Sequence, residues 1–217
     1  MVMVAMNLPA LPTYECVKKQ FSGMPLSSDD VWNGIEKMVL VEAGSGSKPT
    51  LASTVQSFWT EEALYYRFVC EDDRIVATLS GHDAPIYEED VVEVFLSETH
   101  DIQSYKEFEH SPANVQFDAT IINNLDGTYK VNLDWHAEGW ETTVDKNEDG
   151  SELTYIWKMP FVNFEGGTPK ANDEWLMNCY RIDRGESEQE DQYMAWSQTG
   201  IVDFHTPRRF GTLRFVD

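Results

Sequence analysis

Short apolar runs separated by turn signals fill most of the chain, and this spacing limits its fold more than any other feature. The runs are rich in β-branched and aromatic side chains, and no helix-period pattern exceeds about two turns. Eleven runs are predicted to be strands: residues 38–43, 52–58, 63–70, 91–96, 113–122, 128–135, 140–144, 153–159, 175–182, 193–196 and 212–216. Two connections read as tight hairpins, because Gly127 and Gly150 follow Asp and supply the positive φ that such turns need. About eleven short strands predict an all-β, antiparallel β-sandwich of the jelly-roll or immunoglobulin-like type.

The chain length suits one such domain. A domain of 217 residues buries roughly 70% of the surface that its unfolded chain exposes, so it needs no disulfide or metal staple. Pro9, Pro12 and Pro25 discourage helix near the start. We therefore expect residues 1–30 to be an extended lead-in and residues 31–217 to form a single sandwich domain.

The charge balance restricts the possible partners. The sequence has 38 acidic and 16 basic residues, with a formal net charge of -22. Such a surface repels nucleic acid and anionic lipid. Suitable partners are neutral molecules such as sugars, cations such as Ca²⁺, or a basic protein, although solubility alone explains the charge equally well.

Cysteine usage and the N-terminal residues bear on localisation. Cys16, Cys70 and Cys179 are widely spaced, which favours buried, inert thiols over a disulfide framework or a zinc knuckle. Residues 1–10 lack the positive charge and cleavage site of a secretory signal, and no run of 18 apolar residues occurs. These features slightly favour the cytoplasm and predict no membrane span.

Acidic stretches at residues 71–73 and 83–90 offer the oxygen ligands that calcium prefers, although a charged sheet rim explains them equally well. Residues 145–150 match the first half of an EF-hand loop, but Ile156 stands where the bidentate Glu belongs. This loop is therefore predicted to be a solvated hairpin.

Glu93 is the carboxylate whose position most needs an explanation. Strand alternation places it on the same face as Val91 and Phe95, inside an apolar strand. A carboxylate in such surroundings needs a specific partner, either an Arg or a ligand hydroxyl. Near the C-terminus, Phe204 lies in a loop whose aromatic and hydrogen-bonding side chains suit recognition of a flat, polar molecule.

Catalytic signatures are lacking in the sequence. No nucleophile elbow, zinc-protease motif or glycine-rich phosphate loop occurs. The five histidines, at positions 82, 100, 110, 136 and 205, are scattered without metal-ligand spacing. The sequence thus favours a binding protein over an enzyme.

Several segments, in this order, resemble the family 9 carbohydrate-binding modules, which belong to a wider DOMON-like group of β-sandwiches. They are V-W-N at 31–33, L-Y-Y-R-F-V-C-E-D at 64–72, I-Y-E-E-D-V-V-E-V-F-L at 86–96, N-C-Y-R-I-D-R at 178–184, and A-W-S at 195–197 followed by F-H-x-P-x-x-F-G-x-L-x-F at 204–215. The E-D-x-V-E-V-F and F-G-x-L segments are the most specific of them.

This resemblance implies non-catalytic binding of a mono- or oligosaccharide, in a role linked to carbohydrate catabolism and polysaccharides. It implies a slot in which two aromatic rings grip the end of a glycan and a carboxylate binds hydroxyls. By position, Tyr87 and Phe204 are the rings, where sugar binders often have Trp, and Glu93 is the carboxylate. Tyr180 and Arg181 fall along the slot, and Asp118 stands where a binder has Arg. The smaller rings predict modest affinity, about micromolar to millimolar. The resemblance also implies one or more structural Ca²⁺ ions, without identifying their ligands.

Other functions stay open at this stage. A DOMON-like sandwich that holds b-type haem needs axial ligands, for which Met177, Met194 and His205 are available. A glycoside-processing enzyme could use Glu88 and Glu93 as its two acids. In an extended chain these two residues lie roughly 15 Å apart, which is too far for either glycosidase geometry. A degenerate slot that contacts only a partner protein is the remaining alternative.

Overall fold

The computed structural model describes residues 8–217, so most of the segment on which the secretory-signal prediction rests lies outside the described residues. Fourteen strands and four short 3-10 helices make up the fold. The strands are β1 (Thr13–Lys18), β2 (Met38–Val39), β3 (Val41–Glu42), β4 (Ser53–Trp59), β5 (Ala63–Glu71), β6 (Val91–Ser97), β7 (Ser104–His110), β8 (Gln116–Asn123), β9 (Tyr129–Asn132), β10 (Glu141–Lys146), β11 (Glu152–Pro160), β12 (Glu174–Asp183), β13 (Gln192–Ala195) and β14 (Gly211–Val216). The 3-10 helices are η1 (Asp30–Trp32), η2 (Ile86–Glu88), η3 (Phe161–Asn163) and η4 (Pro207–Arg209).

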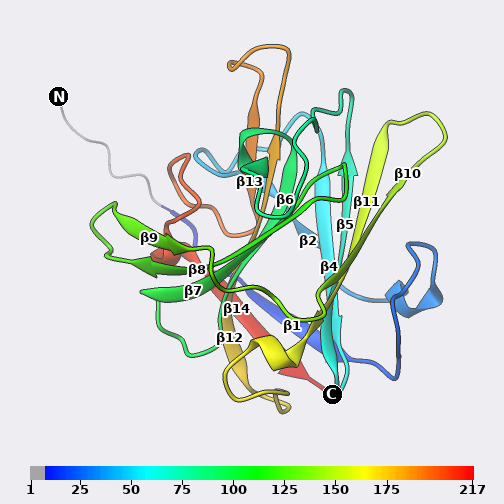
Figure 1. Ribbon diagram of the computed structural model, residues 1–217, viewed down its shortest axis with the longest axis vertical. Coiled ribbons are helices and arrows are strands. Elements are labelled where there is room, and N and C mark those ends of the chain that lie inside the picture. Colours follow the sequence, from blue (N-terminus) through cyan, green and yellow to red (C-terminus); the bar gives the residue numbers. More distant parts are fainter. Residues whose placement is uncertain (1–7) are drawn as a thin grey trace.

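The strands form one continuous sheet that curls on itself, as a sandwich requires. Its order is β10-β11-β5-β4-β1-β14-β12-β6-β7-β8-β9, with β13 beside β12 and β3, and β2 beside β4. In Figure 1, β7, β8 and β9 lie on one side of the molecule and β10 and β11 on the other. The all-β prediction is confirmed.

The main core lies where the two halves of the curled sheet face each other. Tyr66, Phe68 and Trp157 come from β5 and β11, and they share this core with Val94 of β6 and Cys179 of β12. All five are fully buried. Each large apolar side chain buried in this way stabilises the fold by about 1.5–3 kcal/mol.

Strand β6 is buried on both faces, and this determines where Glu93 points. Val92, Val94 and Leu96 face the main core. Val91 and Phe95 belong to a second apolar cluster on the opposite face, together with residues of β7, β8 and the 204–210 segment. Because side chains alternate along a strand, Glu93 points into the second cluster, as the sequence predicts.

Two strands depart from the sequence-based expectation. β1 lies within the predicted lead-in, where Tyr14 and Cys16 alternate as buried residues between proline-containing segments. It pairs in parallel with β14 and β4, so the sheet is not purely antiparallel. β7 was not predicted at all. Its buried positions alternate between apolar and charged side chains, so it lacks the apolar run by which the other strands are recognised.

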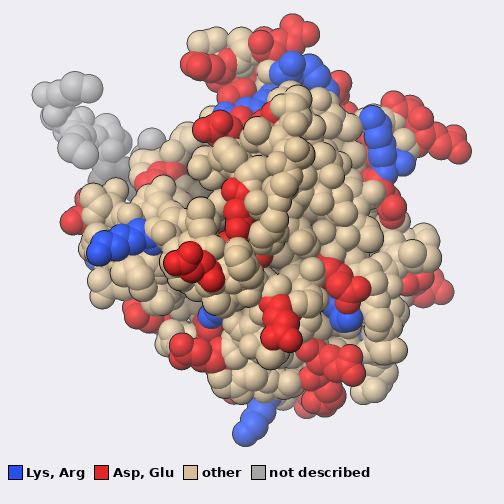
Figure 2. Space-filling view, in the orientation of Figure 1, with Lys and Arg blue, Asp and Glu red and all other residues tan. Residues whose placement is uncertain are grey.

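The remaining local predictions are consistent with the structure. Gly127 and Gly150 adopt positive φ values of 91° and 77° at their hairpin turns. The three cysteines are free and buried, and burial raises the pKa of Cys16 to about 12. Across residues 8–217 the structure has no helix long and apolar enough to cross a membrane. Figure 2 shows acidic side chains outnumbering basic ones on the face it displays.

Candidate functional site

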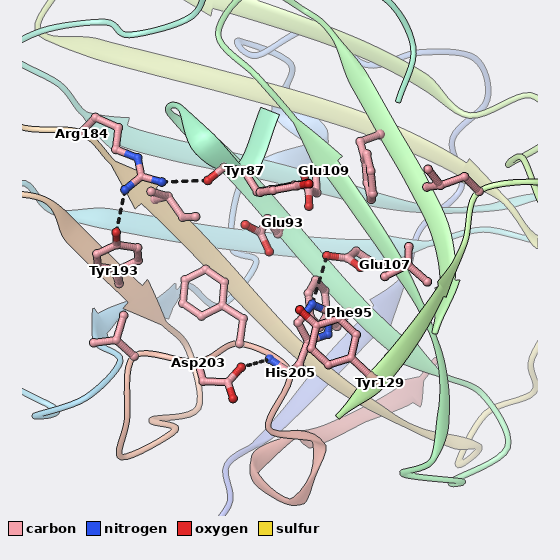
Figure 3. A pocket seen from close by; sticks show the side chains of 16 residues that line it. Tyr87, Glu93, Phe95, Glu107, Glu109, Tyr129, Arg184, Tyr193, Asp203 and His205 are labelled. Carbon is pink, nitrogen blue, oxygen red and sulfur yellow. Dashed lines mark hydrogen bonds and ion pairs between the residues drawn. The ribbon is translucent and has the colours of Figure 1, made fainter. Parts of the chain in front are cut away.

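A cavity of about 430 Å³ opens on the outer face of the half-sheet formed by β12, β6, β7, β8 and β9. Strands supply its floor, and the loop between β13 and β14 supplies one wall (Figure 3). Its lining residues are Tyr87, Glu93, Phe95, Glu107, Glu109, Phe117, Tyr129, Val131, Leu133, Ile182, Arg184, Tyr193, Val202, Asp203, Phe204 and His205. A mostly apolar lining with a few convergent polar groups is typical of small-molecule sites.

Three glutamates converge at the floor of this cavity. Glu93 on β6 lies directly opposite Glu109 on β7, and Glu107 is two residues away on the same face of β7. One carboxylate oxygen from each lies within 4.8 Å of the others, and all three side chains are buried. Within the described chain, no N–H or O–H group donates to Glu93 Oε1 or to either carboxylate oxygen of Glu109. These oxygens therefore lack a protein donor, and both side chains line the cavity.

Burial and mutual repulsion favour the neutral forms of these glutamates. Burial is the main cause that raises the pKa of Glu107 to about 7. Burial, followed by the charges of neighbouring glutamates, holds the pKa of Glu93 and of Glu109 well above the usual range. A protonated carboxyl group donates one hydrogen bond and accepts others. The floor therefore offers both donors and acceptors near neutral pH.

Aromatic side chains form the walls. Tyr87 is 44% exposed, and its ring packs edge-on against Phe117 at 5.9 Å between centroids. Tyr129 is 43% exposed and stacks on the imidazole of His205 at 3.8 Å. Phe204 is backed by the ring of Tyr180, which stacks on it at 4.2 Å. The rings are thus held in place from behind while some of their surface faces the cavity.

His205 contacts side chains of both the wall and the floor of the cavity. Its Nδ1 lies 2.8 Å from the Tyr105 hydroxyl, and its backbone N–H donates to Asp203 Oδ1 at 2.9 Å. Its Nε2 lies 3.8 Å from Glu107 Oε1. Burial lowers the pKa of His205 to about 4, so the ring is neutral at physiological pH.

Arg184 fixes the rim of the cavity. Its guanidinium donates to the carboxylate of Asp191 at 2.8 Å and to the hydroxyl of Tyr193 at 2.6 Å. It also donates to the backbone carbonyl of Tyr87 at 2.9 Å, which ties the η2 segment to the end of β12 (Figure 3). Arg184 therefore holds two aromatic residues of the lining in place.

The structure brings only part of the predicted residue set together. Tyr87, Glu93 and Phe204 line the cavity. Tyr180 does not line it, because it lies behind Phe204 and donates its hydroxyl to the Phe204 carbonyl at 3.0 Å. Its role here is to support the wall.

Asp118 and Arg181 point to the opposite face of the sheet, which corrects their predicted placement. On β12, Tyr180 and Ile182 face the cavity side, so alternation directs Arg181 away. Its buried guanidinium pairs with Asp72 at 3.1 Å and Asp183 at 2.6 Å. On β8, Phe117 faces the cavity, and Asp118 points instead toward His82 and His136. Burial is the main cause that raises the pKa of Asp118.

Sequence reasoning missed several residues of the cavity. Glu107 and Glu109 lie on the unpredicted strand β7, and Tyr129 lies on a strand whose inward face was not assigned. The signal was available in the pattern Y-x-E-x-E at 105–109, which alternates with Lys106, Phe108 and His110. Carboxylates at the inward positions conceal this pattern from a search for apolar alternation.

Comparison with protein families decides the classification. The family described as "Carbohydrate family 9 binding domain-like" matches residues 27–217. The chain belongs to this family. Its members are binding domains by that description, and the matched region contains every residue of the cavity.

Known structures share the fold of this family 9 domain. A candidate carbohydrate-binding protein from Bacteroides uniformis superposes with a TM-score of 0.73 at 19% identity, covering 95% of this chain and 100% of that one. A family 9 module from Caldicellulosiruptor kristjanssonii in complex with cellotriose gives 0.69 at 12% identity, covering 94% of each chain. The glucose complex of a family 9 module from the same organism gives 0.65, also at 12% identity, again covering 94% of each chain.

Two protein sequences are also similar to this domain. An extracellular protein of Arthroderma benhamiae is 25% identical over 180 residues, covering 78% of this chain and 81% of that protein. Endo-1,4-beta-xylanase A of Thermotoga neapolitana is 25% identical over 191 residues, covering 87% of this chain but only 16% of the enzyme. The match is therefore to a small part of that xylanase.

The alternative functions find no support in these comparisons or in the geometry. Met177 and Met194 lie in the main core, away from the cavity, and the hydroxyl of Tyr66 donates to the Met177 sulfur at 3.2 Å, so the haem ligands are not assembled. Glu88 is exposed and lies outside the cavity that contains Glu93.

Calcium stays a prediction. In the acidic stretch before β6, the Glu89 carboxylate accepts hydrogen bonds from the backbone N–H groups of Thr78 and Leu79. The Asp90 carboxylate accepts from those of Val76 and Arg184. These side chains thus already hold loop backbone in place, as the charged-rim interpretation expects.

Proposed function

We propose that the cavity binds the end of a neutral saccharide without catalysing a reaction on it. The observation that carries this proposal is the set of buried glutamate oxygens without protein donors, enclosed by partly exposed aromatic rings. A pyranose has apolar C–H faces that stack on aromatic rings and edge hydroxyls that bind charged or amide groups. The family assignment and the cellotriose and glucose bound by the similar structures support the same ligand class.

Each group of the cavity then has a role. Tyr87, Tyr129 and Phe204 supply stacking surface for the ring faces of the sugar. Glu93 and Glu109 bind hydroxyls through their carboxyl groups, which in the protonated form both donate and accept hydrogen bonds. An acidic floor disfavours sugars that carry carboxylate or sulfate groups. The ligand class is therefore neutral mono- and oligosaccharides.

The context of the domain in carbohydrate catabolism is also part of the proposal. The similarity to a small part of a xylanase supports a role in holding a polysaccharide close to a degrading enzyme. A basic partner protein, suggested by the net charge of -22, is a further part of this proposal.

Calorimetric titration with glucose, cellobiose, xylobiose and galactose tests the proposal. We expect saturable binding of at least one sugar with a Kd of about micromolar to millimolar. Tyr87→Ala and Phe204→Ala should abolish measurable binding. Ile122→Ala, at an exposed position of β8 outside the cavity, is the matched control and should bind as the unmodified protein does. Equal binding by all variants, or no binding across the panel, would contradict the proposal.

A further inference from the structure

A second cluster of ligand-type side chains lies outside the saccharide cavity. His82, Asp83, Asp118 and His136 each place one imidazole nitrogen or carboxylate oxygen within 4.8 Å of the others. They come from three separate parts of the chain. His82 and Asp83 lie in the loop before η2, Asp118 lies on β8, and His136 lies in the loop between β9 and β10. Folding therefore assembles a group that no sequence spacing reveals.

The distances in this cluster differ from those of ordinary hydrogen bonds. His82 Nε2 lies 3.4 Å from Asp83 Oδ1 and 3.3 Å from Asp118 Oδ2. His136 Nδ1 lies 3.7 Å from Asp83 Oδ2 and 3.4 Å from Asp118 Oδ1. A charge-assisted hydrogen bond spans about 2.7–2.9 Å. Ligand atoms about 2.0–2.1 Å from a tetrahedral zinc ion lie about 3.3–3.4 Å from one another, which is close to the observed spacing.

Backbone groups hold both carboxylates in this arrangement. The backbone N–H of Ala137 donates to Asp118 Oδ1, and that of Asp118 donates to Asp83 Oδ1, each at 3.3 Å. The backbone N–H of Asp83 donates in turn to the carbonyl of Gln116 at 3.1 Å, which anchors the loop to β8. Hydrogen bonds of this kind orient metal ligands in known sites.

The charge of Asp118 also calls for a cation. Its side chain is 1% exposed, and its ion-pair partners among residues 8–217 are the two histidines, with no Lys or Arg. A buried carboxylate whose charge no cation balances is costly, even where one backbone N–H donates to it. His82 and His136 are about half exposed, so an ion can reach the cluster from solvent.

We propose that His82 Nε2, His136 Nδ1 and one oxygen each of Asp83 and Asp118 bind a divalent transition-metal ion of the zinc class. Two imidazole nitrogens and two carboxylates in a four-coordinate set suit zinc. Calcium takes about six to eight oxygen ligands, so a site with two nitrogens disfavours it. Of its four ligands, only Asp83 belongs to the acidic stretches at residues 71–73 and 83–90.

The bound ion would join segments that also form the saccharide cavity. Asp83 precedes Tyr87 by four residues, and His136 follows Leu133 by three. Tyr87 and Leu133 both line the cavity, on the other face of β8 from Asp118. Metal binding would therefore stabilise the fold and fix two parts of the cavity lining. It does not require that the cavity bind sugar.

The test uses the full chain, freed of metal with a chelator and then titrated with Zn²⁺, Co²⁺ and Ca²⁺. We expect one equivalent of Zn²⁺ to bind and Co²⁺ to give the intense visible absorption of a four-coordinate site. At zinc 100 times above its Kd, the Tm should rise by about 5–10 °C. Excess Ca²⁺ should not displace the zinc.

Single-ligand variants locate the site. His82→Ala and His136→Ala change half-exposed residues, so the chain should fold, and each should lose at least about 100-fold in zinc affinity, more than loss of an outer-shell partner costs. His100→Asn is the matched control, because His100 is exposed and outside the cluster, and it should bind zinc as before. Zinc binding that is absent in the unmodified chain, or unchanged in both alanine variants, would overturn the proposal. So would a cobalt spectrum of the weak, six-coordinate type.

Discussion

Glu93 and Glu109 face each other across neighbouring antiparallel strands, and both side chains are buried. Two buried carboxyl groups placed directly opposite each other on two strands cannot both ionise without a large cost, and even the neutral groups lose hydrogen bonds to water on burial. A fold that retains such a pair loses stability at this position. The pair is nevertheless useful for binding, because its carboxyl groups at the floor of the cavity can form the hydrogen bonds that a sugar needs.

Replacing Glu93 by Gln should weaken ligand binding without weakening the fold. In Glu93→Gln one oxygen and the volume of the side chain remain, but an amide NH₂ replaces the second oxygen of the carboxyl group, so one hydrogen bond to a sugar hydroxyl is lost. We expect a loss of affinity of about 2- to 10-fold, because a hydrogen bond between neutral groups contributes about 0.5–1.5 kcal/mol. The Tm should stay the same or rise. Calorimetry and thermal unfolding measure both, with Glu148→Gln at an exposed loop position as the control. A variant that binds sugar as tightly as the unmodified chain would rule out Glu93 as a ligand.

Glu107 should make the free energy of unfolding fall as the pH rises, which is the opposite of what an ion-paired carboxylate does. Its pKa is raised from 4.5 to about 7, so between these values the folded chain binds more protons than the unfolded chain. The free energy of unfolding therefore falls as pH rises through this window, by about 3 kcal/mol for this group. Glu107→Gln should match the unmodified protein below pH 4.5 and exceed its Tm at pH 8 by about 6–12 °C.

His205 and His110 change the stability with pH in the opposite direction to Glu107. Comparing Glu107→Gln with the unmodified protein separates the two effects. Burial lowers the pKa of His205 to about 4 and that of His110 to about 3. Their unfolded forms bind protons first as pH falls below about 6.5, so they remove stability on the acid side. Both histidines are present in Glu107→Gln, so the difference in Tm between the two proteins reports on Glu107 together with Glu93 and Glu109, whose pKa values are raised by burial and also by its charge. A difference that does not grow with pH would contradict its raised pKa.

Arg181 should matter for folding and not for sugar binding. Its guanidinium is buried between Asp72 and Asp183 on the face away from the cavity. Arg181→Met leaves two buried carboxylates without a cation, which costs about 3–5 kcal/mol. The Tm should fall by about 6–20 °C, while affinity measured well below the new Tm stays unchanged. A selective loss of affinity at an unchanged Tm would instead make Arg181 a ligand-binding residue.

Tyr180 should act through Phe204. In Tyr180→Phe the stacked ring remains, but the hydrogen bond from its hydroxyl to the Phe204 carbonyl is lost. One buried hydrogen bond contributes about 0.5–1.5 kcal/mol, so both stability and affinity should decrease modestly. Affinity should fall about 2- to 10-fold, which calorimetry resolves. Tyr155→Phe, a buried tyrosine of β11 in the main core, is a control that should change the Tm alone.

The sequence predicts those features of the molecule that depend on residues close together in the chain. Runs of β-branched and aromatic residues identify most strands, and the placement of Glu93 between Val92 and Val94 identifies a buried carboxylate. β7 escapes prediction because its inward positions hold Glu107 and Glu109, whose burial depends on the neighbouring strands. His82 and His136 are 54 residues apart, so only the tertiary fold brings them together. Strand alternation places adjacent residues on opposite faces, so Arg181 lies on the other face of β12 from Tyr180, and Asp118 on the other face of β8 from Phe117.

The most direct test of the account is a crystal structure of the protein soaked with the sugar that binds most tightly in calorimetry. We expect density for a sugar ring in the cavity, against Tyr87 or Phe204, with a hydroxyl within hydrogen-bonding distance of Glu93. Density for the sugar on any other surface, with the carboxylates of Glu93 and Glu109 free of contacts, would contradict it.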